Sequence, residues 1–162
     1  MLQKTKSRNI ISLKTSEREV SDAKRMSRHR APSIKSKYYL PKEEYLTVVH
    51  YALRYPALLS EYNVLADTAG AIRYDRDKVQ TSVDYDSTFE AATKLAKIGE
   101  KLHKIENALE LSAPNETMKK YLRQSVCDGL SEYQLIQQGM RCGHGMFSNM
   151  RGRFYYELAG MI

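Results

Sequence analysis

An apolar stripe with a seven-residue period runs through residues 87–111, and it restricts the fold more than any other feature of the sequence. Its alternating steps of four and three join Ala91, Leu95, Ile98, Leu102, Ile105 and Leu109. This spacing places all of them on one side of an α-helix, as at the a and d positions of a coiled coil. Ser87, followed three residues later by Glu90, predicts a capping box at the start. We therefore predict one continuous helix over residues 87–111.

The same stripe allows two ways of packing. The helix can lie against other helices of its own chain, or it can form a homodimer through residues 87–111 with a second copy. Because the stripe covers barely three heptads, which is short for a coiled coil, the sequence favours packing within the chain. The outer side of the helix carries Lys94, Lys97, Lys101 and Lys104. Such a row is typical of a solvated face.

Shorter helical patterns surround the long helix and end at proline or glycine. Pro56 must interrupt the pattern that begins near Pro41, and Gly129 ends the pattern that follows Pro114. We expect helices over about 41–55, 56–66, 87–111, 114–128, 131–138 and 144–160, with a long polar connection over residues 67–86. These patterns predict an all-α fold, nearly all helical, for residues 38–162.

The last two helices have the order of a helix-turn-helix. Ser131 stands at an N-cap position, and Gln134 three residues later predicts a capping box. Gly139 ends this short helix where a left-handed residue is needed. Together with the supporting helix before them, residues 112–162 make a three-helix unit. A helical hairpin with a polar outer face, without any DNA, is the alternative for this pattern.

The last helix separates an apolar side from a polar side. The side predicted to be buried consists of Phe147, Met150, Phe154, Leu158 and Met161, and the outward side of Ser148, Asn149, Gly152, Arg153 and Tyr156. Arg and Asn side chains pair at two points with guanine and adenine edges. We therefore predict DNA contacts from Arg141, His144, Ser148, Asn149, Arg153 and Tyr156. The alternative for Arg153 is a helical ion pair with Glu157.

Two glycines lower the helix propensity of this last stretch. Gly145 and Gly152 each weaken a helix by roughly 1 kcal/mol relative to alanine. They predict a helix that starts late or bends.

The positive charge of the chain belongs to its N-terminal tail. Residues 1–37 hold eleven Lys and Arg against three acidic residues, a net charge of +8, whereas residues 38–162 have a net charge of −1. Arg25, Arg28 and Arg30 form the densest basic patch, and we predict that they contact DNA phosphates without reading sequence. We expect the tail to be flexible, and a solubilising leader is the alternative role.

Other function classes lack their sequence signatures. The chain has no apolar run long enough to span a membrane and no secretory signal, so we expect a cytoplasmic protein. Cys127 and Cys142 stand without a cluster of histidines, which favours reduced cysteines and no metal site. Because no phosphate-binding glycine loop or nucleophile motif is present, we expect no cofactor and no enzymatic activity.

Five short stretches carry a resemblance to a known family. They are YYLPKE (38–43), HYALRYP (50–56), IRYDRDKVQTS (72–82), GMRCG (139–143) and RFYY (153–156). The chain resembles the RinA and ArpU type regulators of late genes, which are encoded in phages and mobile elements of Gram-positive bacteria. Their C-terminal part is similar to the promoter-reading region of sigma factors. The resemblance covers about residues 38–162, and it implies a DNA-binding activator that works with host RNA polymerase.

These observations divide the chain into three parts. Residues 1–37 form a basic flexible tail, residues 38–111 a helical part with the long helix, and residues 112–162 a helix-turn-helix unit. We expect a sequence-specific transcription regulator of phage or mobile-element genes, with double-stranded DNA and host RNA polymerase as partners. The main alternative is a small protein of the same origin that binds and inhibits or redirects a host protein through its Tyr-rich helices, since Tyr is enriched at interface anchors.

Overall fold

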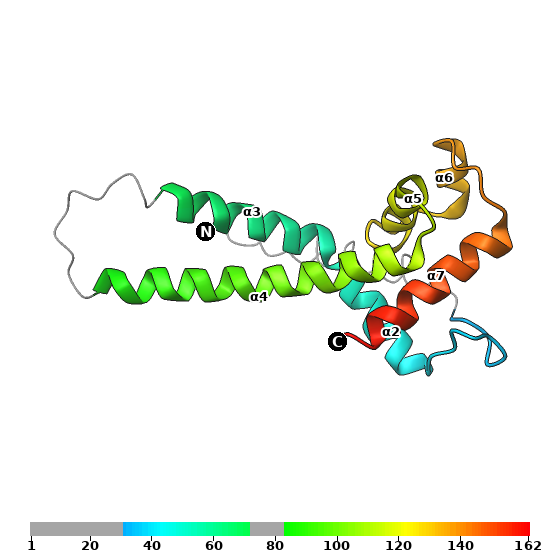
Figure 1. Cartoon of the computed structure of the whole chain (residues 1–162), viewed down its shortest axis with the longest axis horizontal. Helices are drawn as coiled ribbons and strands as arrows, with labels where there is room; N and C mark the ends of the chain where they lie inside the picture. The colour runs from blue at the N-terminus through cyan, green and yellow to red at the C-terminus, as the bar shows by residue number, and fades with distance from the viewer. Residues whose placement is uncertain (1–30, 72–82) are drawn as a thin grey trace, which may run out of the picture. The chain divides into compact units, whose positions relative to one another are not determined.

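The computed structural model of the chain describes residues 31–71 and 83–162, which are all-α (Figure 1). These residues contain six helices and no strand: α2 (Lys42–Leu53), α3 (Tyr55–Ala71), α4 (Val83–Ser112), α5 (Glu116–Val126), α6 (Glu132–Gln137) and α7 (His144–Ala159). The predicted fold class is therefore confirmed. Residues 32–162 form one compact unit.

The long helix is continuous over residues 87–111, as predicted, and packs within its own chain. Figure 1 shows α3 lying antiparallel beside α4, and α4 also contacts α5 and α7. The stripe residues Ile98, Leu102, Ile105 and Leu109 are buried, whereas Ala91 and Leu95 are half-buried. The two helices are close at Gly99, where an added Cβ atom would lie 3.4 Å from Cε2 of Tyr62 in α3. A homodimer through this helix stays a prediction.

Both ends of the predicted polar connection are helical, which corrects the expectation for residues 67–86. Residues 67–71 belong to α3, and residues 83–86 belong to α4. Ser87 consequently lies inside α4 and is not its N-cap. The Ala residues at the end of α3 favour helix, and pairing of α3 with α4 stabilises turns that local signals alone leave undecided. Residues 72–82 lie outside the described residues.

The core gathers where α2, α4 and α7 meet. Tyr45 of α2 and Tyr155 of α7 are buried with their rings edge to face, at a centroid distance of 5.1 Å. The centroid of the Phe154 ring lies 5.2 Å from the centroid of the same Tyr155 ring. Burial raises the pKa of both tyrosines above its ordinary value. Tyr155 was not among the residues that the helical wheel placed inside.

A single tyrosine hydroxyl joins the first turn of α3 to α4. Tyr55 is buried, and its Oη donates a hydrogen bond to Oε1 of Glu106 at 2.8 Å. Burial and the Glu106 carboxylate raise the pKa of Tyr55 to about 12. The folded state therefore favours the protonated phenol. The stability that this group contributes is complete below about pH 10 and is lost as the pH rises to about 12.

We expect Tyr55→Phe to lower the free energy of unfolding at pH 7 by about 0.5–1.5 kcal/mol, the usual contribution of one hydrogen bond. The difference in the free energy of unfolding between wild type and variant should narrow between about pH 10 and pH 12, because the wild-type hydroxyl then ionises. Urea titrations across this pH range measure both effects. Tyr133→Phe, at an exposed site, is the matched control. A difference that stays constant up to pH 12 would contradict the role of this hydrogen bond.

Candidate nucleic-acid interface

Side-chain hydrogen bonds cap the starts of α5 and α6, and the sequence predicts the cap of α6. Asn115 caps α5 by accepting a hydrogen bond from the Met118 backbone N–H at 2.9 Å. At the start of α6 the predicted capping box is present: Oγ of Ser131 accepts from the Gln134 N–H, and Oε1 of Gln134 accepts from the Ser131 N–H at 2.9 Å. These caps satisfy N–H groups that a helix start would leave unpaired.

The turn after α6 needs a glycine and is closed by a buried methionine. Gly139 has a φ of +97°, which favours glycine and confirms the predicted left-handed end of the helix. Met140 is buried, and its N–H donates to the Leu135 carbonyl at 3.0 Å. Tyr121 of α5 donates its hydroxyl to the Gln138 carbonyl at 3.3 Å. The position of the turn is thus set by α5, which contacts both α6 and α7.

The buried side of α7 agrees with the prediction. Phe147, Met150, Phe154 and Leu158 are buried, and Met161 beyond the helix end is half-buried. The helix runs from His144 to Ala159 without interruption. The expectation of a late start at its glycines is therefore wrong, and the expected bend stays a prediction. Packing of the apolar side against α2, α4 and α5 outweighs the weak propensity of two glycines.

The outward side of α7 agrees only in part, because Gly152 is buried. A Cβ atom at this position would lie 3.6 Å from Cβ of Tyr38 and 3.8 Å from Cγ of Pro32. The Tyr38 ring also stands 6.0 Å from the ring of Tyr156, centroid to centroid. The physical reason is that a non-helical segment covers this part of α7, which a helical wheel cannot indicate.

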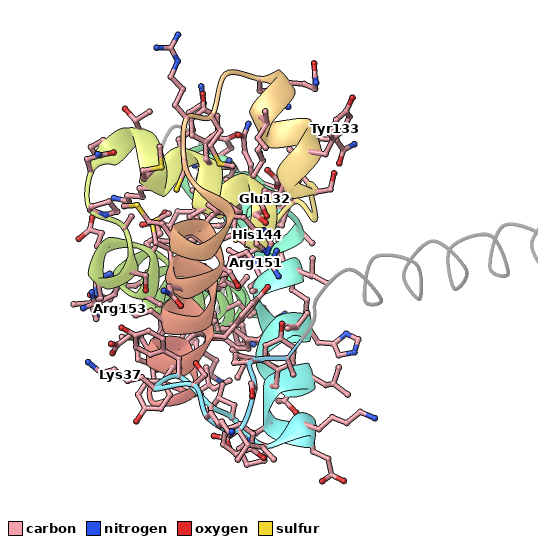
Figure 2. The ribbon with its side chains drawn as sticks, turned by 90° about the vertical axis from the view of Figure 1, so that its right-hand side faces the viewer. Lys37, Glu132, Tyr133, His144, Arg151 and Arg153 are labelled. Carbon is pink, nitrogen blue, oxygen red and sulfur yellow. The ribbon has the colours of Figure 1, made fainter. Side chains whose placement is uncertain are left out.

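The first half of α7 remains open. His144, Ser148 and Asn149 are exposed, and so is Arg141 in the turn before the helix. Nδ1 of His144 lies 2.7 Å from Oε2 of Glu132, so this contact ties the start of α7 to the start of α6. Figure 2 shows both side chains, with Tyr133 of α6 pointing away from the molecule.

Arg153 lies in the second half of α7, where it contacts an acidic side chain. Nε of Arg153 lies 3.6 Å from Oε1 of Glu157, and 43% of the Arg153 side chain is exposed. The ion pair with Glu157, the alternative to the predicted base contact of Arg153, is thus present. Arg153 also lines a surface pocket of about 230 Å³ together with Tyr38 and Asn149. Tyr156 is exposed beside Tyr38.

Sequence reasoning did not single out Arg151. Arg151 is half-buried, and its side chain interacts with Tyr45 of α2, which lowers the pKa of that tyrosine against the larger effect of burial. Its Nε atom is buried and has no hydrogen-bond partner among the described residues. Figure 2 shows Arg151 and Arg153 on opposite sides of α7. A signal existed in the sequence, because position 151 continues the apolar steps of four and three between Phe147 and Phe154. An arginine in a buried stripe indicates a group that needs a specific neighbour.

Three of the predicted contact residues cannot be placed. Arg25, Arg28 and Arg30 lie outside the described residues, and so does most of the predicted flexible tail. Residues 31–37, the end of that tail, are described, and both Lys35 and Lys37 are exposed.

The described residues were also compared with what a reactive thiol, a metal site or a membrane span requires. Cys127 is buried, which raises the pKa of its thiol, and Cys142 is also a free thiol. Within residues 31–71 and 83–162, no three His, Cys, Asp or Glu side chains gather where they could hold a metal ion. None of the helices in these ranges is both long and apolar enough to cross a membrane.

The described residues form an all-α unit in which the first half of α7 is exposed on one side and packs on other helices on its apolar side. Comparison of the chain with models of protein families, with curated proteins and with solved structures found no match.

Proposed function

We propose that this chain is a sequence-specific DNA-binding protein that regulates transcription of phage or mobile-element genes. One observation carries the proposal: the first half of α7 is exposed, while its apolar side rests on α5 and a short capped helix precedes it. In helix-turn-helix proteins the N-terminal residues of the second helix contact base edges in the major groove. The open half of α7 is the half that such docking requires.

The chemistry of this open half suits the edges and phosphates of a duplex. Arg141, Ser148 and Asn149 supply hydrogen-bond donors, and Asn can hold adenine at two points. Residues 133–149 contain no Asp or Glu, and Oε2 of Glu132, just before them, lies 2.7 Å from Nδ1 of His144. Phosphates beside residues 133–149 therefore meet no carboxylate from this stretch. The gene class and the partnership with host RNA polymerase rest on the resemblance to RinA and ArpU type regulators.

A protein-binding module is the second candidate, and α6 favours it. Tyr133 is 71% exposed and Ile136 is 47% exposed, and Tyr is a frequent anchor at protein interfaces. Titration of residues 31–162 against random duplex DNA separates the candidates. Salt-dependent binding by this unit alone supports the regulator, whereas binding that requires the tail supports the module.

We expect Arg153→Ala to weaken binding to a preferred duplex by about 1–3 kcal/mol and to change binding to random DNA little. The reason is that a guanidinium can hold guanine at two points. The preferred duplex comes from selection out of a random pool. Glu157→Ala is the matched control, because it breaks the same ion pair and leaves the guanidinium in place.

The comparison of the two variants decides the role of Arg153. If Arg153→Ala weakens both duplexes equally, or neither, Arg153 does not read a base. If Glu157→Ala matches its effect, the ion pair accounts for the result. Asn149→Ala, one turn earlier on α7, then tests whether reading is confined to the open half of the helix.

A further inference from the structure

Met146, in the open half of α7, is a large apolar side chain in contact with water. It is 54% exposed, whereas Met150, four residues later, is buried. Side chains three and four residues apart are neighbours on a helix, so Met146 lies beside both Asn149 and Met150. A single exposed apolar side chain is common on protein surfaces, but Met146 also forms part of the wall of a pocket.

This pocket is the one that Arg153 lines, and it has a volume of about 230 Å³. Met146, Met150 and Pro114 give it apolar surface, and Asn149 and Arg153 add N–H donors. None of the described residues that line it is acidic. The pocket therefore suits a group in which apolar surface lies next to hydrogen-bond acceptors.

A second wall of the pocket, where α4 ends, offers a ligand apolar surface rather than donors. Oγ of Ser112 and the N–H of Ala113 each donate to a backbone carbonyl of α4, at 2.7 Å and 3.0 Å. Pro114 has no N–H. The acceptors of a ligand must consequently face α7, where Asn149 is exposed and 43% of the Arg153 side chain is exposed.

Thymine presents this combination of groups in the major groove of duplex DNA. Its 5-methyl group lies next to the O4 acceptor, and apolar side chains recognise the methyl group by contact. The adenine paired with it offers the N6 and N7 atoms that an Asn side chain can hold at two points. Cβ atoms three residues apart on a helix are about 5–6 Å apart. Met146 and Asn149 can therefore reach groups of one base pair or of two neighbouring pairs.

We propose that this pocket receives the 5-methyl group of a thymine, with Met146 as its apolar wall and Asn149 on an adenine beside it. This inference rests on the proposed function and adds to it a preference for an A·T pair at a defined place in the site. Cytosine lacks the methyl group, and it presents a donor where thymine presents O4. The N–H donors of the pocket would then face another donor.

Replacement of thymine by deoxyuridine tests the contact, because deoxyuridine lacks only the methyl group. A preferred duplex is selected with the wild-type chain from a random pool, and its thymines are replaced one at a time. We expect one replacement, next to a base pair that Asn149→Ala affects, to weaken binding about fourfold, the contribution of one buried methyl group. Fluorescence anisotropy measures the affinities at one fixed salt concentration.

Three variants assign the methyl contact to Met146. Met146→Ala removes the apolar wall, so it should bind the thymine and deoxyuridine duplexes with equal affinity. Met146→Leu keeps an apolar side chain of similar volume and should keep the preference for thymine. Leu59→Ala is the matched control, because it shortens an exposed apolar side chain of α3, outside the pocket. Thermal melting checks that the variants fold like the wild type.

Two outcomes overturn the inference and leave the proposed function standing. In the first, a preferred duplex is found, but no replacement of thymine weakens binding. In the second, the sensitive thymine stays equally sensitive in Met146→Ala, so that another side chain contacts its methyl group. If no preferred duplex can be selected, the proposed function fails together with the inference.

Discussion

Phe154→Ala should lower the free energy of unfolding by about 3–5 kcal/mol, the cost of removing a large aromatic side chain from a packed core. Phe154 is 0% exposed and stands 5.2 Å from the Tyr155 ring, which in turn packs on Tyr45 of α2. The cavity would open where α7 meets α2 and α4, the contacts that hold the C-terminal unit to the long helix. Urea titration at constant temperature measures the loss.

The chain contains its own control for this substitution. Phe89→Ala removes the same side chain from α4 at a site that is 68% exposed, so we expect a change within about 0.5 kcal/mol. Equal losses for the two variants would mean that the expected burial of Phe154 is wrong. A lower denaturant slope for Phe154→Ala would indicate that α7 separates from the rest of the unit before global unfolding.

Replacing the nine Lys and Arg of residues 1–30 by glutamine should flatten the salt dependence of binding to random duplex, and residues 31–162 should keep the rest of it. Each lost phosphate contact lowers the slope of log K against log salt by about 0.9, so loss of the three contacts from Arg25, Arg28 and Arg30 lowers it by about three. Between about 50 and 200 mM salt, the wild type should then lose about fortyfold more affinity than the variant. Fluorescence anisotropy at four salt concentrations measures both slopes.

A scrambled tail separates charge from sequence. A chain in which residues 1–30 are reordered, with composition unchanged, should keep the wild-type slope if Arg25, Arg28 and Arg30 contact phosphates only as charges. A changed slope would mean that the order of these residues matters. An unchanged slope in the glutamine variant would mean that the tail is a solubilising leader, the role that its composition also allows.

Helix positions follow from the sequence where local signals agree with packing. The stripe from Ala91 to Leu109 predicts the continuous part of α4, because every member faces one side of a helix whatever its partner is. Ser131 and Gln134 predict the start of α6 for a different reason: their hydrogen bonds join atoms three residues apart. Helix ends are predicted less well. The turns of α3 and α4 next to residues 72–82 have no strong local signal.

The candidate interface divides in the same way. The buried side of α7 is a property of apolar spacing, so Phe147 and Phe154 are predicted correctly. Gly152 and Arg151 are not. The neighbour of Gly152 is Tyr38, more than a hundred residues earlier in the chain, and Arg151 lies beside Tyr45. Contacts between residues so far apart in the chain do not affect the spacing of apolar residues around either partner, so this spacing cannot predict them.

Local patterns in the chain were enough to predict the all-α class, the long helix and the capped start of α6. These depend on helical periodicity and on hydrogen bonds between near neighbours, both of which are properties of short stretches. Which half of α7 is open depends on contacts between distant parts of the chain. Residues 32–40 cover Gly152, because their turns and the buried Leu40 place Tyr38 there. Exposure depends on all elements packed around a residue, and the sequence of one helix does not contain that information.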